Sequence, residues 1–158
     1  MFQKFVSLGE FSKLSHKDKT VVMTTGVFDV PHVGHPRYLY TARMLGDLLV
    51  VGVHSDELVR QRKGEGRPIY PLEERVELLS YYGCVDFILE LKDQEDVYGT
   101  IRTVRPKILV VSTTTEDEAN SPATMSSMFG DSMAVAVLGP QSFRHTTDLV
   151  EKQEVIEK

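Results

Sequence analysis

Short apolar runs alternate with amphipathic segments along most of the chain. Five runs rich in β-branched and aliphatic residues are expected to form strands, namely Thr20–Thr24, Leu48–Val53, Val85–Leu89, Lys107–Val111 and Met133–Leu138. Most of them are nearly continuously apolar, which is typical of strands that are covered on both faces of a sheet. The pattern therefore predicts a parallel sheet with helices packed on both of its faces.

The segments between these runs carry apolar residues at helical spacing. Three stripes result, formed by Tyr38, Leu39, Ala42 and Leu45, by Leu72, Val76 and Leu79, and by Val97, Ile101 and Val104. Gly46 and Gly83 are expected to end the first two helices, and Pro71 opens the second. Ser7 and Glu10 have the spacing of a capping box, which predicts a short helix before the first strand.

The remaining segments complete a single-domain prediction. The residues after Thr146 are expected to form a final helix, and the polar stretch Thr113–Pro122 is expected to be a loop at the carboxyl edge of the sheet, where ligands of such folds bind. No repeat or interdomain linker interrupts the pattern. Residues 1–158 are therefore predicted to be one Rossmann-like, doubly wound α/β domain with about five parallel strands.

Composition and charge narrow the classes of function. The net charge of −5 gives no broad electrostatic reason to bind nucleic acid. No apolar run approaches the length of a membrane span, and the first residues lack the apolar core of a secretory signal. Cys84 is the single cysteine, which excludes an internal disulfide. A cytoplasmic location, with neither nucleic-acid nor membrane partners, is therefore expected.

Candidate chemistry concentrates in the stretch TTGVFDVPHVGHPRYL, residues 24–39, directly after the first predicted strand. It brings His32 and His35 within three residues of each other, and Gly26 and Gly34 allow close approach of a ligand to the backbone. Pro36 suits the first turn of a helix, so both histidines are expected near a helix N-terminus. Unpaired N–H groups at such a terminus favour anions.

Three interpretations of the histidine pair are considered. The first is purely structural, with both side chains capping the turn. The second is a metal site, but zinc needs a third or fourth ligand and Cys84 is remote. The third is phosphate binding, which the position, the glycines and the helix start favour together.

The longer string identifies a family. GVFDVPHVGH resembles the HxGH signature of the nucleotidyltransferase superfamily, in which His32, Gly34 and His35 match the signature positions. ARMLGDLLVVGVHSDELV and KGEGRPIYPLEERVELLSYYGCVD resemble the second helix–strand unit and the K-G-x-x-R-P loop of its cytidylyltransferase-like branch. With the leading FVSLGEFSKL, the chain looks most similar to the adenylyltransferase domain of ADP-heptose synthesis, and next to glycerol-3-phosphate cytidylyltransferase. The match runs from about Phe5 to Gln153 and weakens after Val111.

The resemblance implies a role for each matching residue. His32, His35 and Lys63 are implied as catalytic residues that contact the triphosphate and stabilise the transition state. Asp29 and Arg67 are implied as acceptor-binding residues. The residues implied to bind nucleotide are Thr25, Gly26, Val27, Phe28, Gly34, His35, Arg67, Thr146 and Thr147.

Some of the implied elements also have structural explanations. The basic stretch Arg60–Arg67 could be a solvated charged loop, although its place beyond the second strand favours a functional role. Arg75 could be a surface ion-pair partner of a neighbouring glutamate on its amphipathic helix as easily as a site residue. Thr146 or Thr147 could cap the final helix, which is compatible with phosphate binding there.

One segment departs from the family pattern. After the fourth strand the branch typically has a basic residue and glycines, whereas here Ser112 is followed by the acidic run Glu116–Glu118. Carboxylates at this point would repel phosphate unless magnesium intervenes or they face solvent. Mg²⁺ is expected to enter with the triphosphate, with no dedicated cage of protein ligands.

The resulting prediction is an enzyme that transfers a nucleoside monophosphate from ATP or CTP to a phosphorylated sugar or polyol and releases pyrophosphate. The resemblance favours ATP with a sugar 1-phosphate, and CTP with glycerol 3-phosphate is the alternative. A nucleotide-binding regulatory protein with reduced catalysis is a second class of hypothesis, because Ser112 replaces a basic residue. A homodimer is expected because members of this branch are often dimers.

Overall fold

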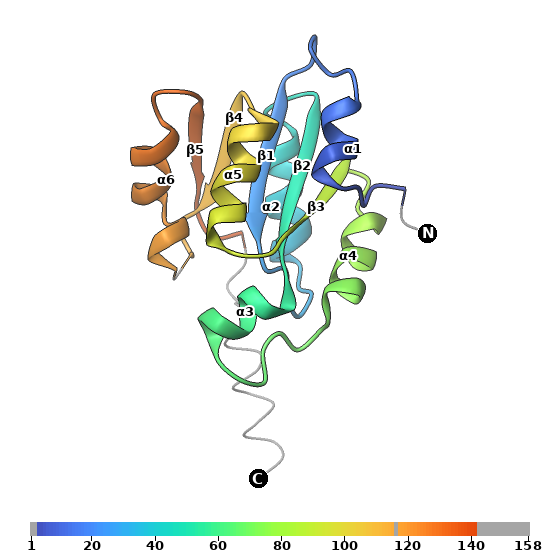
Figure 1. Ribbon diagram of the computed structural model, residues 1–158, viewed down its shortest axis with the longest axis vertical. Helices are drawn as coiled ribbons and strands as arrows, with labels where there is room; N and C mark the ends of the chain where they lie inside the picture. Colours follow the sequence, from blue (N-terminus) through green and yellow to red (C-terminus); the bar gives the residue numbers. More distant parts are fainter. Residues whose placement is uncertain (1–2, 116, 142–158) are drawn as a thin grey trace.

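The computed structural model describes residues 3–115 and 117–141, and its elements alternate between strand and helix (Figure 1). The strands are β1 (Val21–Gly26), β2 (Leu48–His54), β3 (Phe87–Leu91), β4 (Ile108–Ser112) and β5 (Ala134–Leu138). The helices are α1 (Leu8–Lys13), α2 (Gly34–Arg43), α3 (Asp56–Lys63), α4 (Leu72–Tyr81), α5 (Gln94–Val104) and α6 (Pro122–Phe129), with a 3₁₀ turn, η1 (Glu118–Asn120).

The five strands form one parallel sheet in the order β3-β2-β1-β4-β5. After β1 the chain builds outward through β2 and β3, and it then returns to the other side of β1 to add β4 and β5. The reversal leaves a crevice beyond the carboxyl ends of β1 and β4, which is where sheets of this type bind ligands. The predicted doubly wound α/β architecture is confirmed.

Helices cover both faces of the sheet, and each face has its own apolar core. Val21 and Met23 of β1 pack into a cluster with residues of α1, α5 and α6. Val22, which points to the opposite face, packs with Leu39 of α2 and Val76 of α4. Figure 1 shows α1 and α5 in front of the sheet and α2 behind it. The nearly continuous apolar strands of the sequence are explained by this double coverage.

The predicted elements are confirmed with shifted boundaries, and two helices were not predicted. Each strand lies within two residues of its expected range, and the Ser7–Glu10 capping box is present at α1. Gly46 does not cap α2, which ends at Arg43; a side chain at Gly46 would instead meet the Thr20 carbonyl oxygen at 2.6 Å. The predicted final helix lies outside the described residues.

The basic stretch Arg60–Arg67 was expected to be a loop, and half of it is helical. Ser55 caps α3 by accepting a hydrogen bond from the backbone N–H of Leu58, and Lys63 is the last residue of the helix. Gly64 then turns the chain with φ of 90°. The second unpredicted helix, α6, follows the expected loop directly, where Ser121 caps it. Within the described residues, no helix has the length and apolar character that crossing a membrane requires.

Candidate active site

A cleft of about 920 Å³ opens at the carboxyl edge of the sheet. Its walls come from the turn between β1 and α2, the end of β2, α3, the segment after β4 and the segment after β5. This volume suits a nucleotide or a small-molecule substrate. The sequence-predicted residues that line it are Thr25, Gly26, Val27, Phe28, Asp29, His32, Gly34, His35, Lys63 and Arg67. Thr146 and Thr147 lie outside the described residues.

The two histidines stand side by side at the start of α2. Their ring centroids are 4.1 Å apart, and the His35 ring also meets the edge of the Phe28 ring at 5.7 Å. Nδ1 of His32 accepts a hydrogen bond of 3.0 Å from the backbone N–H of Gly34. His32 therefore accepts a hydrogen bond from the first N–H group of α2, which fits the structural interpretation for this one histidine, and it lines the cleft as well.

A hydrogen bond fixes which ring nitrogen of His32 can donate, and burial determines the charge of His35. Because Nδ1 of His32 accepts from Gly34, the proton of a neutral His32 ring is on Nε2. Burial lowers the pKa of His35 from its ordinary 6.5 to about 4, and the proximity of His32 acts in the same direction, whereas Asp29 opposes the shift. At neutral pH His35 is therefore an uncharged imidazole with one N–H to offer to an oxyanion.

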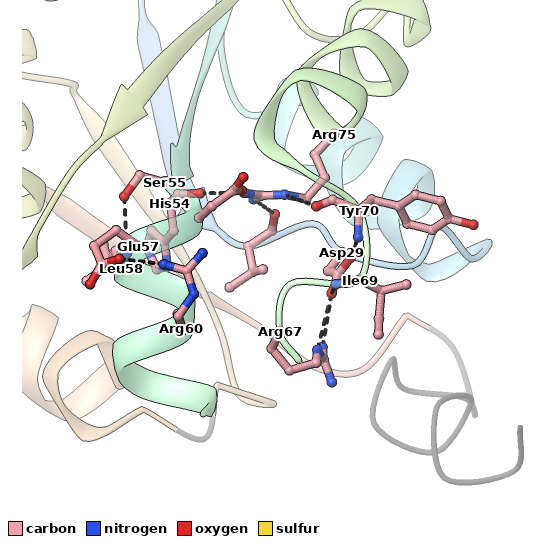
Figure 2. Close-up of polar contacts among 12 residues, drawn as sticks. Asp29, His54, Ser55, Glu57, Leu58, Arg60, Arg67, Ile69, Tyr70 and Arg75 are labelled. Carbon is pink, nitrogen blue, oxygen red and sulfur yellow. Dashed lines mark hydrogen bonds and ion pairs between the residues drawn. The ribbon is translucent and has the colours of Figure 1, made fainter. Parts of the chain in front are cut away.

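Asp29 anchors the loop that follows α3. Its Oδ1 accepts hydrogen bonds from the backbone N–H groups of Val30 and Tyr70, and its Oδ2 accepts from the backbone N–H of Ile69 and from Nε of Arg67. Figure 2 shows this carboxylate facing the loop from the turn after β1. Asp29 is only 2% exposed, so its geometry favours a role in positioning Arg67 over direct contact with an acceptor.

Arg75 is buried, so the interpretation of this residue as a surface ion-pair partner of a neighbouring glutamate was wrong. It is 1% exposed and connects four segments of the chain (Figure 2). Its guanidinium donates to the carbonyl oxygens of Tyr70, Val27 and His54, and it forms an ion pair of 2.7 Å with Asp56. None of the glutamates on its own helix is its partner in these contacts. The helical pattern could not reveal this role, because all four acceptors come from other segments.

The segment after β4 supplies hydroxyl groups to the cleft. Ser112 and Thr114 lie at its wall, and their hydroxyl oxygens are 2.7 Å apart. The nearby Asp117 is neutralised by Arg62 of α3, because Nη1 of Arg62 lies 2.7 Å from its Oδ2. The acidic run therefore does not present Asp117 as a bare negative charge to a phosphate.

Sequence reasoning missed several cleft residues, of which Arg62 and His54 are charged or titratable. In the sequence, Arg62 was noted only as part of a basic stretch. Had α3 been predicted as a helix, its period would have placed Arg62 on the face opposite the exposed Arg60. His54, the last residue of β2, is 5% exposed. Burial lowers the pKa of His54 to about 3, and the positive charges of Arg62, Arg75 and Lys63 act in the same direction.

Stability is expected to decrease in mild acid because of His54. In the unfolded chain this side chain binds a proton below its ordinary pKa of 6.5, whereas in the folded protein it stays neutral down to about pH 3. The free energy of unfolding should thus fall by a few kcal/mol as the pH drops from about 6.5 towards 3. Urea denaturation at pH 7, 6 and 5 should give a shallower pH dependence for His54→Gln than for the wild type. Equal slopes would contradict this assignment.

A comparison of the sequence with family models matches residues 23–152 to the family described as cytidylyltransferase-like. The chain is 39% identical over 108 residues to the bifunctional protein HldE of Campylobacter fetus, a match that covers 68% of this chain and 23% of that protein. It is 46% identical over 94 residues to HldE of Syntrophotalea carbinolica, covering 60% of this chain and 19% of that protein. The matches thus span about a fifth of these curated relatives.

Solved structures agree with this assignment. The lipopolysaccharide core biosynthesis protein from Thermoplasma volcanium superposes with a TM-score of 0.62 and 30% identity, covering 80% of this chain and 99% of that one. Pantothenate synthetase from Thermus thermophilus shares the fold, with a TM-score of 0.62 and 16% identity over 87% of this chain and 61% of its own. The cleft at the carboxyl edge, the histidine pair at the start of α2 and the match over residues 23–152 together place the chain in the cytidylyltransferase-like family of nucleotidyltransferases.

Proposed function

We propose that this protein transfers a nucleoside monophosphate from a triphosphate to a phosphorylated sugar or polyol and releases pyrophosphate. A phosphate oxygen of the acceptor attacks the α-phosphorus of the nucleotide, a new P–O bond forms, and the bond to the β-phosphate breaks. The preferred substrates are ATP and a sugar 1-phosphate. The alternative pair is CTP and glycerol 3-phosphate.

The observation that carries this proposal is the pair of imidazole rings at the positive end of α2, of which His35 is neutral at pH 7, facing a cleft of nucleotide size. Charge develops on the phosphoryl oxygens during transfer, and preorganised donors stabilise it without having to reorganise. Lys63 and Arg67 line the same cleft and add positive charge for the phosphates. His32, His35 and Lys63 are accordingly proposed as the catalytic residues.

The chemistry requires little beyond positioning and charge stabilisation. The second pKa of a phosphate monoester is about 6, so the attacking oxygen is already ionised at neutral pH. A neutral His35 therefore acts as a hydrogen-bond donor, and no general base is needed for the acceptor. Bringing two anionic substrates into line is the larger task, and aligned donors and cations perform it.

The choice of a sugar acceptor rests on the relatives. The chain resembles the adenylyltransferase domain of ADP-heptose synthesis, and the Thermoplasma volcanium neighbour is described as a protein of lipopolysaccharide core biosynthesis.

Among residues 3–115 and 117–141, no group of three or more His, Cys, Asp or Glu side chains could hold a metal ion. We therefore expect Mg²⁺ to be held by the phosphates and water, as is common for this ion.

A matrix of substrates tests the proposal. ATP, CTP, GTP and UTP, each with Mg²⁺, are combined with sugar 1-phosphates, glycerol 3-phosphate and phosphoethanolamine, and pyrophosphate release is measured. The expected result is selective turnover with ATP and a sugar 1-phosphate. The absence of pyrophosphate from every pair would refute the proposal. Calorimetry that detected tight nucleotide binding in that case would favour the regulatory nucleotide-binding protein instead.

A further inference from the structure

Three polar side chains from separate elements meet on one wall of the cleft. Nη1 of Arg62 lies 2.7 Å from Oδ2 of Asp117 and 3.4 Å from Nδ1 of His54. All three residues line the cleft, and the proposed transfer chemistry uses none of them. We refer to Arg62, Asp117 and His54 as the arginine cluster.

Two nitrogen atoms of the arginine cluster have no hydrogen-bond partner among the described residues. A guanidinium can only donate, so Nδ1 of His54 is the acceptor and the ring proton is on Nε2. Nε2 of His54 and Nη2 of Arg62 are buried, and neither has a hydrogen-bond partner among the described residues. Buried donors are rarely left unpaired, which points to a ligand that supplies the missing acceptors.

Neighbouring side chains hold the cluster in place. Asp117 accepts hydrogen bonds from the backbone N–H of Ala119 and from Nδ2 of Asn120, at 3.0 and 2.6 Å. Asn120 in turn exchanges hydrogen bonds with Gln94 at the start of α5, and the hydroxyl of Tyr98 donates to the Ala119 carbonyl. The carboxylate is therefore preorganised by α5 and does not depend on Arg62 for its position.

The arginine cluster lies across the cleft from the histidine pair. The histidines lie at the N-terminus of α2, which packs on one face of the sheet, whereas Asp117 is anchored to α5, which packs on the other. In-line transfer puts the attacking and leaving oxygens on opposite sides of the α-phosphorus. If the histidine pair holds the triphosphate, as proposed above, the acceptor approaches from the side of the arginine cluster.

The charge of the cluster selects the kind of group it can bind. Arg62 and Asp117 balance each other, and His54 is neutral at pH 7, so the cluster offers both donors and acceptors with no net charge. A phosphate offers only acceptors and would meet the carboxylate, and an ammonium group would meet the guanidinium. A hydroxyl group both donates and accepts, so neighbouring hydroxyls of a sugar ring or polyol fit this arrangement.

We propose that Arg62, Asp117 and His54 form a subsite that binds hydroxyl groups of the acceptor and thereby selects a sugar or polyol phosphate. This inference rests on the proposed function, because it assigns the acceptor side of the same cleft. The subsite determines specificity: phosphoethanolamine, which has no hydroxyl beyond its phosphate, should be a poor acceptor.

The test compares three variants in the full chain. Arg62→Met and Asp117→Asn remove one side of the ion pair each, and Arg60→Met is the matched control, because Arg60 lies on the exposed face of α3 and pairs only with Glu57 in the described contacts. Thermal unfolding confirms that each variant is folded. Steady-state pyrophosphate release then gives the KM for the acceptor and for the triphosphate separately.

Arg62→Met is expected to raise the acceptor KM by roughly 10- to 100-fold, with the triphosphate KM unchanged and Arg60→Met like the wild type. Asp117→Asn leaves a net positive cluster, so it should also raise the KM for a sugar phosphate while inorganic phosphate becomes a stronger competitive inhibitor. A rise in the triphosphate KM alone would overturn the inference and assign the cluster to the ribose. Unchanged constants in both variants would overturn it as well.

A failure of the proposed function gives a different result. In that case the wild type releases no pyrophosphate with any acceptor, and the subsite is judged by calorimetry with glucose 1-phosphate, glycerol 3-phosphate and phosphoethanolamine in the presence of a non-hydrolysable triphosphate. If a phosphate ester that carries hydroxyl groups binds to the wild type but not to Arg62→Met, the proposed subsite is supported. The absence of any such binding would overturn it.

Discussion

Replacing His35 with alanine is expected to lower kcat for pyrophosphate release by about 10²- to 10³-fold, the usual cost of removing one preorganised donor to a developing oxyanion. His35 is half-buried beside His32 and Phe28, and burial keeps the pKa of its ring at about 4, so at pH 7 it donates as a neutral imidazole. Nucleotide binding, measured by calorimetry, should weaken much less than kcat, because the interaction strengthens in the transition state.

The matched control for this substitution lies on the same helix. Tyr40 is 60% exposed on α2 and does not line the cleft, so Tyr40→Ala should leave kcat within about twofold of the wild type. A His35→Ala protein that keeps full turnover would refute the assignment of the histidine pair to catalysis. Loss of activity in Tyr40→Ala as well would indicate that truncation of α2 side chains damages the fold.

Replacing Arg75 with methionine is expected to lower the free energy of unfolding by about 3–5 kcal/mol, the range found when one partner of a buried charged network is removed. Three carbonyl oxygens and the Asp56 carboxylate would lose their donor at once. Urea denaturation measures the change, and the melting temperature should fall by roughly 10 °C.

Arg60→Met controls for the loss of a charged side chain. Its ion pair with Glu57 is exposed on α3, and such pairs contribute at most about 1 kcal/mol. A stability loss for Arg75→Met that is no larger than the loss for Arg60→Met would contradict the network shown in Figure 2. Because Arg75 bonds to the carbonyl of Val27 in the β1–α2 turn, a folded Arg75→Met protein should also have reduced activity.

The fold could be predicted from the sequence because its signals are local. Double coverage of a parallel sheet requires strands that are apolar on both faces, and amphipathic helices have a period that the sequence displays directly. The helix α3 was missed for a related reason. Its residues Arg60–Lys63 are charged or polar and lack a long apolar stripe. The cap at Ser55 and the hydrogen bonds that Arg60 and Gln61 donate to Glu57 stabilise it.

Of the site, only the part that belongs to one contiguous motif could be predicted from the sequence. The HxGH stretch is contiguous, so the histidine pair and its helix start were visible in the sequence. The network of Arg75 and the arginine cluster each join segments that are far apart in the chain. Arg62 and Asp117, for example, belong to segments that follow different strands, and only the parallel sheet brings those segments to the same edge. Burial, which decides the protonation of His54, is likewise a property of the folded chain.

The contacts of Asp29 have a consequence for exchanging loops between relatives. This carboxylate belongs to the turn before the histidine pair, and it accepts hydrogen bonds from the backbone N–H groups of residues 69 and 70. A loop transplanted from another family member would therefore need matching N–H groups at those two positions, whatever side chains it carries. At residues 69 and 70 the segment is thus constrained by its backbone shape, and any loop of that shape would be tied to the turn that carries the histidines.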